Sequence, residues 1–152
     1  MIEENMTVAI DSNILIYAHN VDSIYYEKSR KLLFDLKKEE KIGISSISLI
    51  EFYQVTTDKN KIEKEYTEKQ CRDIINSMQN DSNIEILEYN DTILFNSLKT
   101  VNKYNINSYD IYDHLIAYTA RYYNIENIYT ANSKDFKKYN FLNVYNPITI
   151  NG

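Results

Sequence analysis

The sequence predicts an α/β fold whose central sheet is mostly parallel. Short apolar runs, typical of buried strands, alternate along the chain with longer segments in which apolar residues recur at the helical period. The 152 residues include only two glycines and one proline, so the chain offers few breaks and no evident linker. We therefore expect a single domain over residues 1–152.

The first part of the chain predicts two strand–helix units. Residues 7–10 are an apolar strand, and the Asp-Ser-Asn sequence that follows it is typical of a cap on a short helix at 14–18. Apolar residues spaced among Lys and Glu predict an amphipathic helix at 23–40. A second strand is expected at 42–45. The nearly continuous apolarity of 46–57 then predicts a helix that is largely buried.

The rest of the chain continues the alternation after residues 58–65, a polar stretch that we expect to be an exposed loop. Apolar runs predict strands at 84–87, at 127–130 and near 142–144. Helical periodicity predicts helices at 66–78, 90–104 and 110–123, with a turn of helix at 133–138. In parallel sheets, ligand sites form beyond the carboxyl ends of the strands. Asp11 and residues 130–135 follow such ends.

Composition excludes several classes of protein. The net charge of −5 argues against a general nucleic-acid binder with a basic footprint, unless clustered acids hold divalent cations that invert their local sign. The lone Cys71 excludes an intramolecular disulfide and fits a reducing compartment. No run approaches the roughly 20 apolar residues of a membrane span. We expect a cytoplasmic protein without a membrane partner.

The familiar catalytic motifs based on glycine or histidine are also missing. The sequence has no glycine-rich phosphate loop and no Gly-x-Ser-x-Gly segment, which excludes P-loop, dinucleotide and serine-hydrolase sites. His19 and His114 lie in or beside apolar helical segments and are expected to be structural. The 15 tyrosines could stack on unpaired bases, but most sit at helical spacing and are expected in the core or at its rim.

Two acids occupy positions that are unusual for surface carboxylates. Asp11 directly follows an apolar strand, where it could be a helix cap or part of a site. Glu51 lies in an apolar helix, with Ile47 and Val55 four residues to either side. Burial of a lone carboxylate is costly unless the group is paired or bound to a metal. Glu51 is therefore a candidate functional residue.

Three further acids lie where helices begin. Asp110 and Asp113 open the helix at 110–123, and capping explains one of them but leaves Asp113 close to the inward apolar stripe. Asp135 follows the strand at 127–130 and could again be a cap. A group of such carboxylates suits Mg²⁺, which prefers oxygen ligands and is held by one or two carboxylates together with a substrate phosphate. The sequence leaves open whether one or two ions bind.

Four segments together resemble the signature segments of the PIN-domain nucleases, and most closely those of VapC-type toxins: residues 10–15, 48–51, 112–120 and 130–136. The resemblance implies a three-layer α/β/α fold and an endoribonuclease that depends on Mg²⁺ or Mn²⁺. It also implies that the protein is the toxin of a type II toxin–antitoxin pair. Its partners would be an RNA substrate, a small antitoxin that covers the acidic cleft, and a second copy in a homodimer.

By the same resemblance, Asp11, Glu51 and Asp113 take the three acid roles. The fourth acid stays open, because many members have Asp where this chain has Asn132. Asp135 or Asp110 could supply the missing carboxylate as a metal ligand. The resemblance further implies that Ser12 and Asn13 orient Asp11 and that the Thr130 hydroxyl and Asn132 lie beside the same pocket.

Two functions other than nuclease action have some support in the sequence. A non-catalytic PIN-like module that binds RNA or a protein is favoured by Asn132, since a weakened fourth ligand could abolish turnover. A phosphoacceptor receiver domain would need an acid pair near the first strand and a lysine that ends a late strand. The sequence offers only Glu3 and Glu4 ahead of the first strand, which makes this alternative weak.

Overall fold

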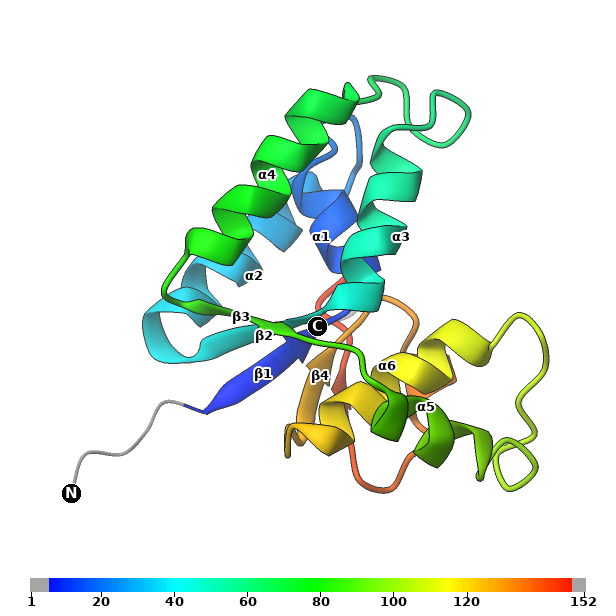
Figure 1. Ribbon diagram of the computed structural model, residues 1–152. Coiled ribbons are helices and arrows are strands. Elements are labelled where there is room, and N and C mark those ends of the chain that lie inside the picture. The colour runs from blue at the N-terminus through cyan, green and yellow to red at the C-terminus, as the bar shows by residue number, and fades with distance from the viewer. Residues whose placement is uncertain (1–5, 149–152) are drawn as a thin grey trace.

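The computed structural model describes residues 6–148, so Glu3 and Glu4 lie outside the described residues. Five strands of the described chain form one sheet in the order β3-β2-β1-β4-β5 (Figure 1). The strands are β1 (Thr7–Ile10), β2 (Lys41–Ser45), β3 (Ile84–Leu87), β4 (Asn127–Tyr129) and β5 (Asn143–Tyr145). All four pairings between neighbours are parallel, which confirms the predicted sheet.

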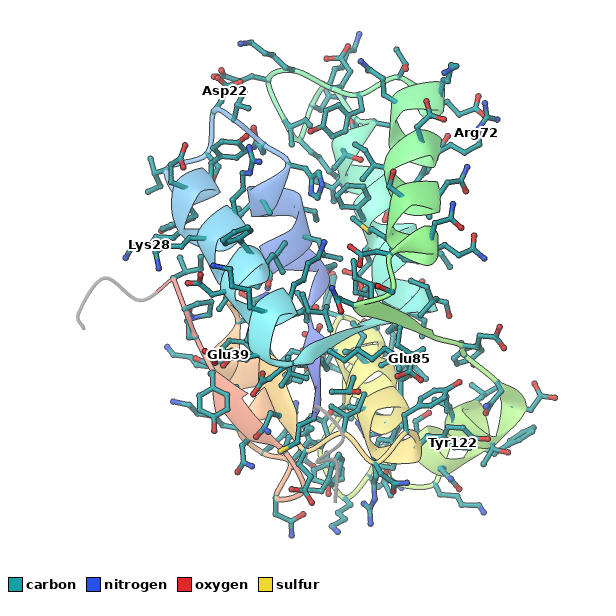
Figure 2. All side chains as sticks on the ribbon, turned by 90° about the vertical axis from the view of Figure 1, so that its left-hand side faces the viewer. Asp22, Lys28, Glu39, Arg72, Glu85 and Tyr122 are labelled. Carbon is teal, nitrogen blue, oxygen red and sulfur yellow. The ribbon has the colours of Figure 1, made fainter. Side chains whose placement is uncertain are left out.

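Helices cover both faces of this sheet, so the predicted three-layer arrangement is confirmed (Figure 1). One face carries α1 (Ser12–Ala18), α2 (Tyr26–Glu39), α3 (Ser46–Thr56) and α4 (Glu68–Asn80). Lys28 of α2 and Arg72 of α4 lie on the outer, exposed side of these helices (Figure 2). The other face carries α5 (Asp91–Leu98), α6 (Ile111–Tyr122) and α7 (Ser133–Phe136). Within residues 6–148, no helix is both long enough and apolar enough to cross a membrane.

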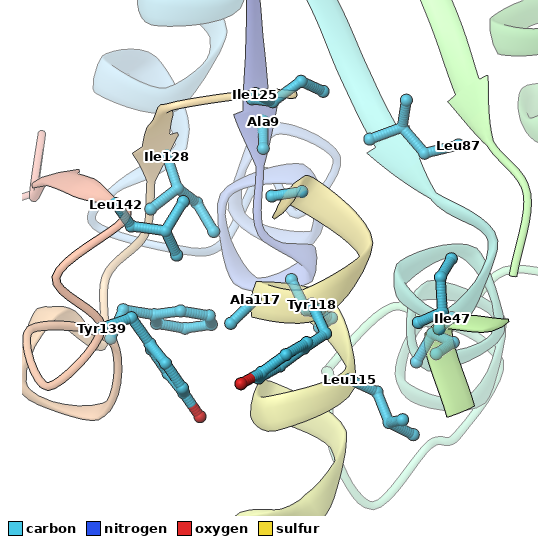
Figure 3. Packing of buried hydrophobic residues seen from close by; sticks show 14 residues of the cluster. Ala9, Ile47, Leu87, Leu115, Ala117, Tyr118, Ile125, Ile128, Tyr139 and Leu142 are labelled. Carbon is cyan, nitrogen blue, oxygen red and sulfur yellow. The ribbon is translucent and has the colours of Figure 1, made fainter. Parts of the chain in front are cut away.

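The strand pleat explains the two cores. Successive side chains of a strand point to opposite faces, so Val8 and Ile10 pack with Ile42 and Ile44 under α1 to α4. Ala9 points to the other face, where it joins the cluster formed with α5, α6 and α7. Figure 3 shows Ala9 and Ile128 of the sheet above Ala117 and Tyr118 of α6. Burial on both faces is why the strands read as continuous apolar runs.

The structure differs from the prediction mainly at the ends of helices. The helix expected at 90–104 ends at Leu98, and the chain continues in turns to Asn105, which has a φ of 53°. The carbonyl oxygen of Ser97 is 2.8 Å from Nε2 of His114, so it is bound outside the helix at the point where α5 ends. The helix expected from residue 66 begins at Glu68, because Thr67 and Gln70 form a capping box.

Candidate active site

The centre of the site is Asp11, at the carboxyl end of β1. Ile10 of β1 is paired in parallel with Tyr129 of β4, so the next residues, Asp11 and Thr130, lie side by side. The Asp11 side chain is 2% exposed. Its Oδ1 accepts a hydrogen bond from the Ser12 N–H (2.7 Å), and its Oδ2 accepts one from the Thr130 hydroxyl (2.8 Å). Asp11 therefore caps α1, as one alternative predicted, and is also a buried carboxylate.

Asn13 fixes the surroundings of Asp11. Its Nδ2 donates to Oδ2 of Asp11 (3.3 Å) and to Oγ1 of Thr130 (3.4 Å), while its Oδ1 accepts from the Ala131 N–H (3.2 Å). Asn132 reaches this network through its backbone N–H, which donates to Oγ1 of Thr130 (3.0 Å). The structure thus places Ser12, Asn13 and Thr130 in contact with the Asp11 carboxylate. Asn132 is connected to this carboxylate only through the Thr130 hydroxyl.

Glu51 is partly buried, as its apolar neighbours in the sequence predicted, and like Asp11 it accepts a hydrogen bond from Ser12. The Ser12 hydroxyl donates to Oε2 of Glu51 (3.0 Å), so this hydroxyl lies between the two acids. Burial, followed by the charge of Asp11, raises the pKa of Glu51. Oε1 of Glu51 is buried and has no hydrogen-bond partner among the described residues. A buried carboxylate oxygen without a donor is costly and fits a cation ligand.

Ser48 is a buried polar residue beside Glu51 on α3 that the sequence analysis did not single out. It lies one helical turn before Glu51 on α3 and is fully buried. Its hydroxyl, like Oε1 of Glu51, makes no hydrogen bond to any described residue. The signal in the sequence is a small polar residue three positions before an acid in an apolar helix, because that spacing places both on one helix face.

Asp113, in the first turn of α6, completes the cluster. It is partly buried, and its pKa is raised to about 7, first by burial and then by the charges of Asp11, Asp135, Glu51 and Asp110. The charges of the other four predicted acids thus all act on Asp113, and the charge of Asp135 also contributes to the raised pKa of Asp11. Asp110 precedes α6 but makes no side-chain capping bond within the described chain.

The acids lie too far apart for direct coordination by several of them at once. Within residues 6–148, no three His, Cys, Asp or Glu side chains are grouped closely enough to hold one ion. This spacing fits Mg²⁺ or Mn²⁺ that keeps several waters and is held by one or two carboxylates. The all-oxygen donor set and the bare Oε1 of Glu51 also fit such an ion.

Comparison with known proteins gives the class of this chain. The model of the PIN domain family matches residues 8–142, so the chain belongs to the PIN domain family and the sequence resemblance is confirmed. A curated relative is Ribonuclease VapC24 of Mycobacterium tuberculosis (strain ATCC 25618 / H37Rv). It is 21% identical over 145 residues, which are 95% of this chain and 99% of the relative.

Solved structures are similar over nearly the same span. VapBC2 from Rickettsia felis, bound to a DNA fragment from its promoter, has a TM-score of 0.65 and 27% identity and covers 93% of this chain and 98% of its own. A toxin–antitoxin complex from Klebsiella pneumoniae has a TM-score of 0.64 and 21% identity and covers 92% and 97%. VapC20 of Mycobacterium tuberculosis, described as a sarcin–ricin loop cleaving toxin, has a TM-score of 0.63 and 10% identity and covers 80% and 86%.

The raised pKa of Asp113 predicts how the metal-free protein responds to pH. The carboxyl group has a pKa of about 7 when folded and about 3.9 when unfolded, so the folded state holds more protons between these values. Stability of the metal-free protein should therefore fall as pH rises from about 4 to 7. Asp113→Asn removes this loss and should raise the melting temperature at pH 8 by a few degrees. Lowering the pH toward 5 should shrink the difference.

Melts in EDTA across this pH range measure the effect. Asp91→Asn is a matched control, because Asp91 lies in the first turn of α5 but is exposed. Loss of its favourable interaction with the helix dipole should lower stability slightly. If Asp113→Asn melts below wild type at pH 8, as the control does, Asp113 is a capping residue. The claim that the carboxylates of the cluster repel one another is then wrong.

The fourth acid can be identified by metal titration. Asp135 raises the pKa of both Asp11 and Asp113, so we expect Asp135→Asn to weaken Mg²⁺ binding more than Asp110→Asn does. Thermal shifts of both variants against Mg²⁺ concentration give the comparison. A larger loss at Asp110 would instead assign the fourth position to the turn that begins α6.

Proposed function

We propose that this protein is an endoribonuclease that depends on Mg²⁺ or Mn²⁺ and is the toxin of a type II toxin–antitoxin pair. The observation that carries the proposal is the group of partly or fully buried carboxylates in a PIN domain: Asp11 at the carboxyl end of β1, Glu51 on α3 and Asp113 at the start of α6. A curated relative bears the name ribonuclease, and similar structures are toxin–antitoxin complexes.

One or two of Asp11, Glu51 and Asp113 would hold the cation directly and the others would act through its bound waters, with Asp135 as the fourth acid. When bound, a divalent cation supplies an activated water and neutralises the charge that develops on the scissile phosphate. Ser12, Asn13 and Thr130 hold the Asp11 carboxylate in one orientation before substrate arrives. Such prior orientation avoids reorganisation during the reaction. Asp113, whose pKa is about 7, can keep a proton on its carboxyl group at neutral pH until a cation replaces it.

A non-catalytic PIN-like module is the alternative. It is supported by Asn132, which makes no side-chain capping bond within the described chain and carries no charge. The two functions differ in turnover, since a binding module would protect RNA without cutting it. Incubation with total cellular RNA, followed by mapping of cleaved ends, separates them.

Two exposed tyrosines favour unpaired RNA as the substrate. Tyr109 is 91% exposed and Tyr112 is 59% exposed, and they lie on either side of Asp110 where α6 begins. The turn is ordered, because Oδ1 of Asn107 accepts from the N–H groups of Tyr109 (2.8 Å) and Asp110 (3.0 Å). An exposed aromatic ring can stack on an unpaired base. The rings thus offer a base platform beside Asp113, with Tyr112 directly before it and Tyr109 four residues before it.

The proposed antitoxin has a groove to occupy. A cavity of about 350 Å³ lies between α1, α2 and α4, with Leu15, Leu33 and Ile74 on its walls. Phe34 at this cavity is 61% exposed, and Arg30 and Lys37 also line it. We assign it to an apolar segment of the antitoxin, because the walls are mainly apolar and the charged border is mixed, with Lys37 paired to Asp81.

Exposed apolar side chains on α3 and α5 are candidates for contact with a second copy of the chain. Ile50 of α3 is 68% exposed, and Phe95 and Leu98 of α5 are 58% and 46% exposed. The two helices are linked where they begin, since the Tyr89 N–H donates to the Ser46 hydroxyl (3.0 Å). Large exposed apolar side chains on adjoining elements mark interaction sites, which supports the proposed homodimer.

Catalysis should need both metal and carboxylates. Glu51→Gln and Asp113→Asn should each lower RNA cleavage by about 10²-fold or more, because loss of even a group that orients a metal ligand costs about 10–100-fold. EDTA should abolish cleavage by wild type. Glu65→Gln, in the exposed loop between α3 and α4, is the matched control and should cut as wild type does. Full activity of either site variant at equal Mg²⁺ would overturn the assignment.

The base platform is tested by substrate affinity. Replacing both Tyr109 and Tyr112 with Ala should raise KM for unpaired RNA about 5- to 150-fold for each base lost, since stacking contributes about 1–3 kcal/mol per base. The Mn²⁺-induced thermal shift should not change, because neither ring is a ligand. Tyr122→Ala, at the far end of α6 and 45% exposed, is the control. An unchanged KM for the double variant would remove the tyrosines from the substrate path.

A further inference from the structure

His114 follows Asp113 on α6 and is completely buried. Its Nε2 is 2.8 Å from the carbonyl oxygen of Ser97, and its Nδ1 is 2.7 Å from the hydroxyl of Tyr139. A carbonyl oxygen only accepts hydrogen bonds, so Nε2 carries the hydrogen and donates it. In the neutral ring Nδ1 is then an acceptor, and the Tyr139 hydroxyl must be its donor.

The environment fixes the state of the Tyr139 hydroxyl and the position of both rings. Burial, followed by the charge of Asp113, raises the pKa of Tyr139, so its hydroxyl stays protonated. The Tyr139 ring is 1% exposed and packs at 4.9 Å from the Tyr104 ring and 5.6 Å from the His114 ring. Figure 3 shows Tyr139 beside Tyr118 of α6. The hydrogen bond is therefore fixed in orientation from both ends.

This hydrogen bond joins the two segments that carry Asp113 and Asp135. Tyr139 follows α7 directly, and its N–H donates to the carbonyl oxygen of Phe136 (3.2 Å), the residue after Asp135. Phe136 is itself fully buried. The hydrogen bond between His114 and Tyr139 thus ties the start of α6, which carries Asp113, to the segment that follows Asp135. Two nearby carboxylates repel each other when both are charged, and a link between their segments opposes that repulsion.

We infer that His114 and Tyr139 are positioning residues, whose hydrogen bond sets the separation of Asp113 and Asp135 so that both carboxylates serve one cation. The inference rests on the proposed metal-dependent function. Filling of the core alone would be served by apolar side chains, whereas a buried polar network is favourable only when every member is satisfied. A network in which every polar group is bonded holds its side chains in one geometry. Carboxylates that share a cation need such a fixed geometry.

Tyr139→Phe is the direct test, because it removes one hydroxyl and leaves the ring. The dissociation constant for Mn²⁺, measured by calorimetry without RNA, should rise about 10-fold, within the range of about 10–100-fold typical of groups that orient metal ligands. Tyr104→Phe makes the same change in a ring 4.9 Å from Tyr139 and should leave the constant unchanged. Equal constants for Tyr139→Phe and wild type would overturn the inference.

A double-mutant cycle identifies the route of the effect. In an Asp135→Asn background, Tyr139→Phe should cause no further loss of Mn²⁺ affinity, because the carboxylate that the hydrogen bond positions is gone. Equal losses in both backgrounds would show that Tyr139 acts elsewhere, and a lower melting temperature without any loss of affinity would show a purely structural role. Wild type that binds no Mn²⁺ would instead refute the proposed function itself.

A second pair of variants covers the case in which Tyr139→Phe does not fold. His114→Gln keeps one amide donor and one acceptor, whereas His114→Leu removes both. If the hydrogen bonds position Asp113, Mn²⁺ affinity should stay closer to wild type in His114→Gln than in His114→Leu. The reverse order would contradict the positioning role.

Discussion

The structure depends on one constraint, the burial of the Asp11 carboxylate at the carboxyl end of the central strand. Transfer of a charge out of water is tolerated only with donors around it, and here the Ser12 N–H, the Thr130 hydroxyl and Asn13 provide them. These donors come from the start of α1 and from the segment after β4. Parallel pairing of β1 with β4 brings the two together. The order of the strands in the sheet therefore determines the geometry of the site.

The same arrangement gathers negative charge that the fold must withstand. Burial and the charges of nearby acids raise the pKa values of both Glu51 and Asp113. The metal-free cluster of carboxylates therefore opposes folding. Hydrogen bonds around the cluster offset this cost by holding the segments that carry the acids in place. Ser12 bridges Asp11 to Glu51, and on the other side of the site Tyr139 bonds to His114 beside Asp113. The Ser12 hydroxyl thus lies between two of the acids, and Oε1 of Glu51 is left without a donor among the described residues.

The sequence predicted those features that depend on residues close together in the chain. An apolar run before Asp11 predicted both the strand and its helix cap, and the apolar flanks of Glu51 predicted its burial. The early end of α5 and the role that we infer for Tyr139 could not be predicted in this way. Both depend on His114, whose partners lie 17 and 25 residues away in the sequence. Ser97 and Tyr139 carry no local pattern that marks such long-range hydrogen bonds.

The acidity of the chain also limits how it could hold RNA. A protein with a net charge of −5 gains little from general attraction to phosphates, so contacts with substrate must be local. Under the proposed function, a bound cation inverts the sign at the carboxylates and attracts the scissile phosphate. Stacking on Tyr109 and Tyr112 adds affinity through base faces, which carry no charge. Such a combination selects for unpaired RNA, since a base inside a duplex presents no free face to an exposed ring.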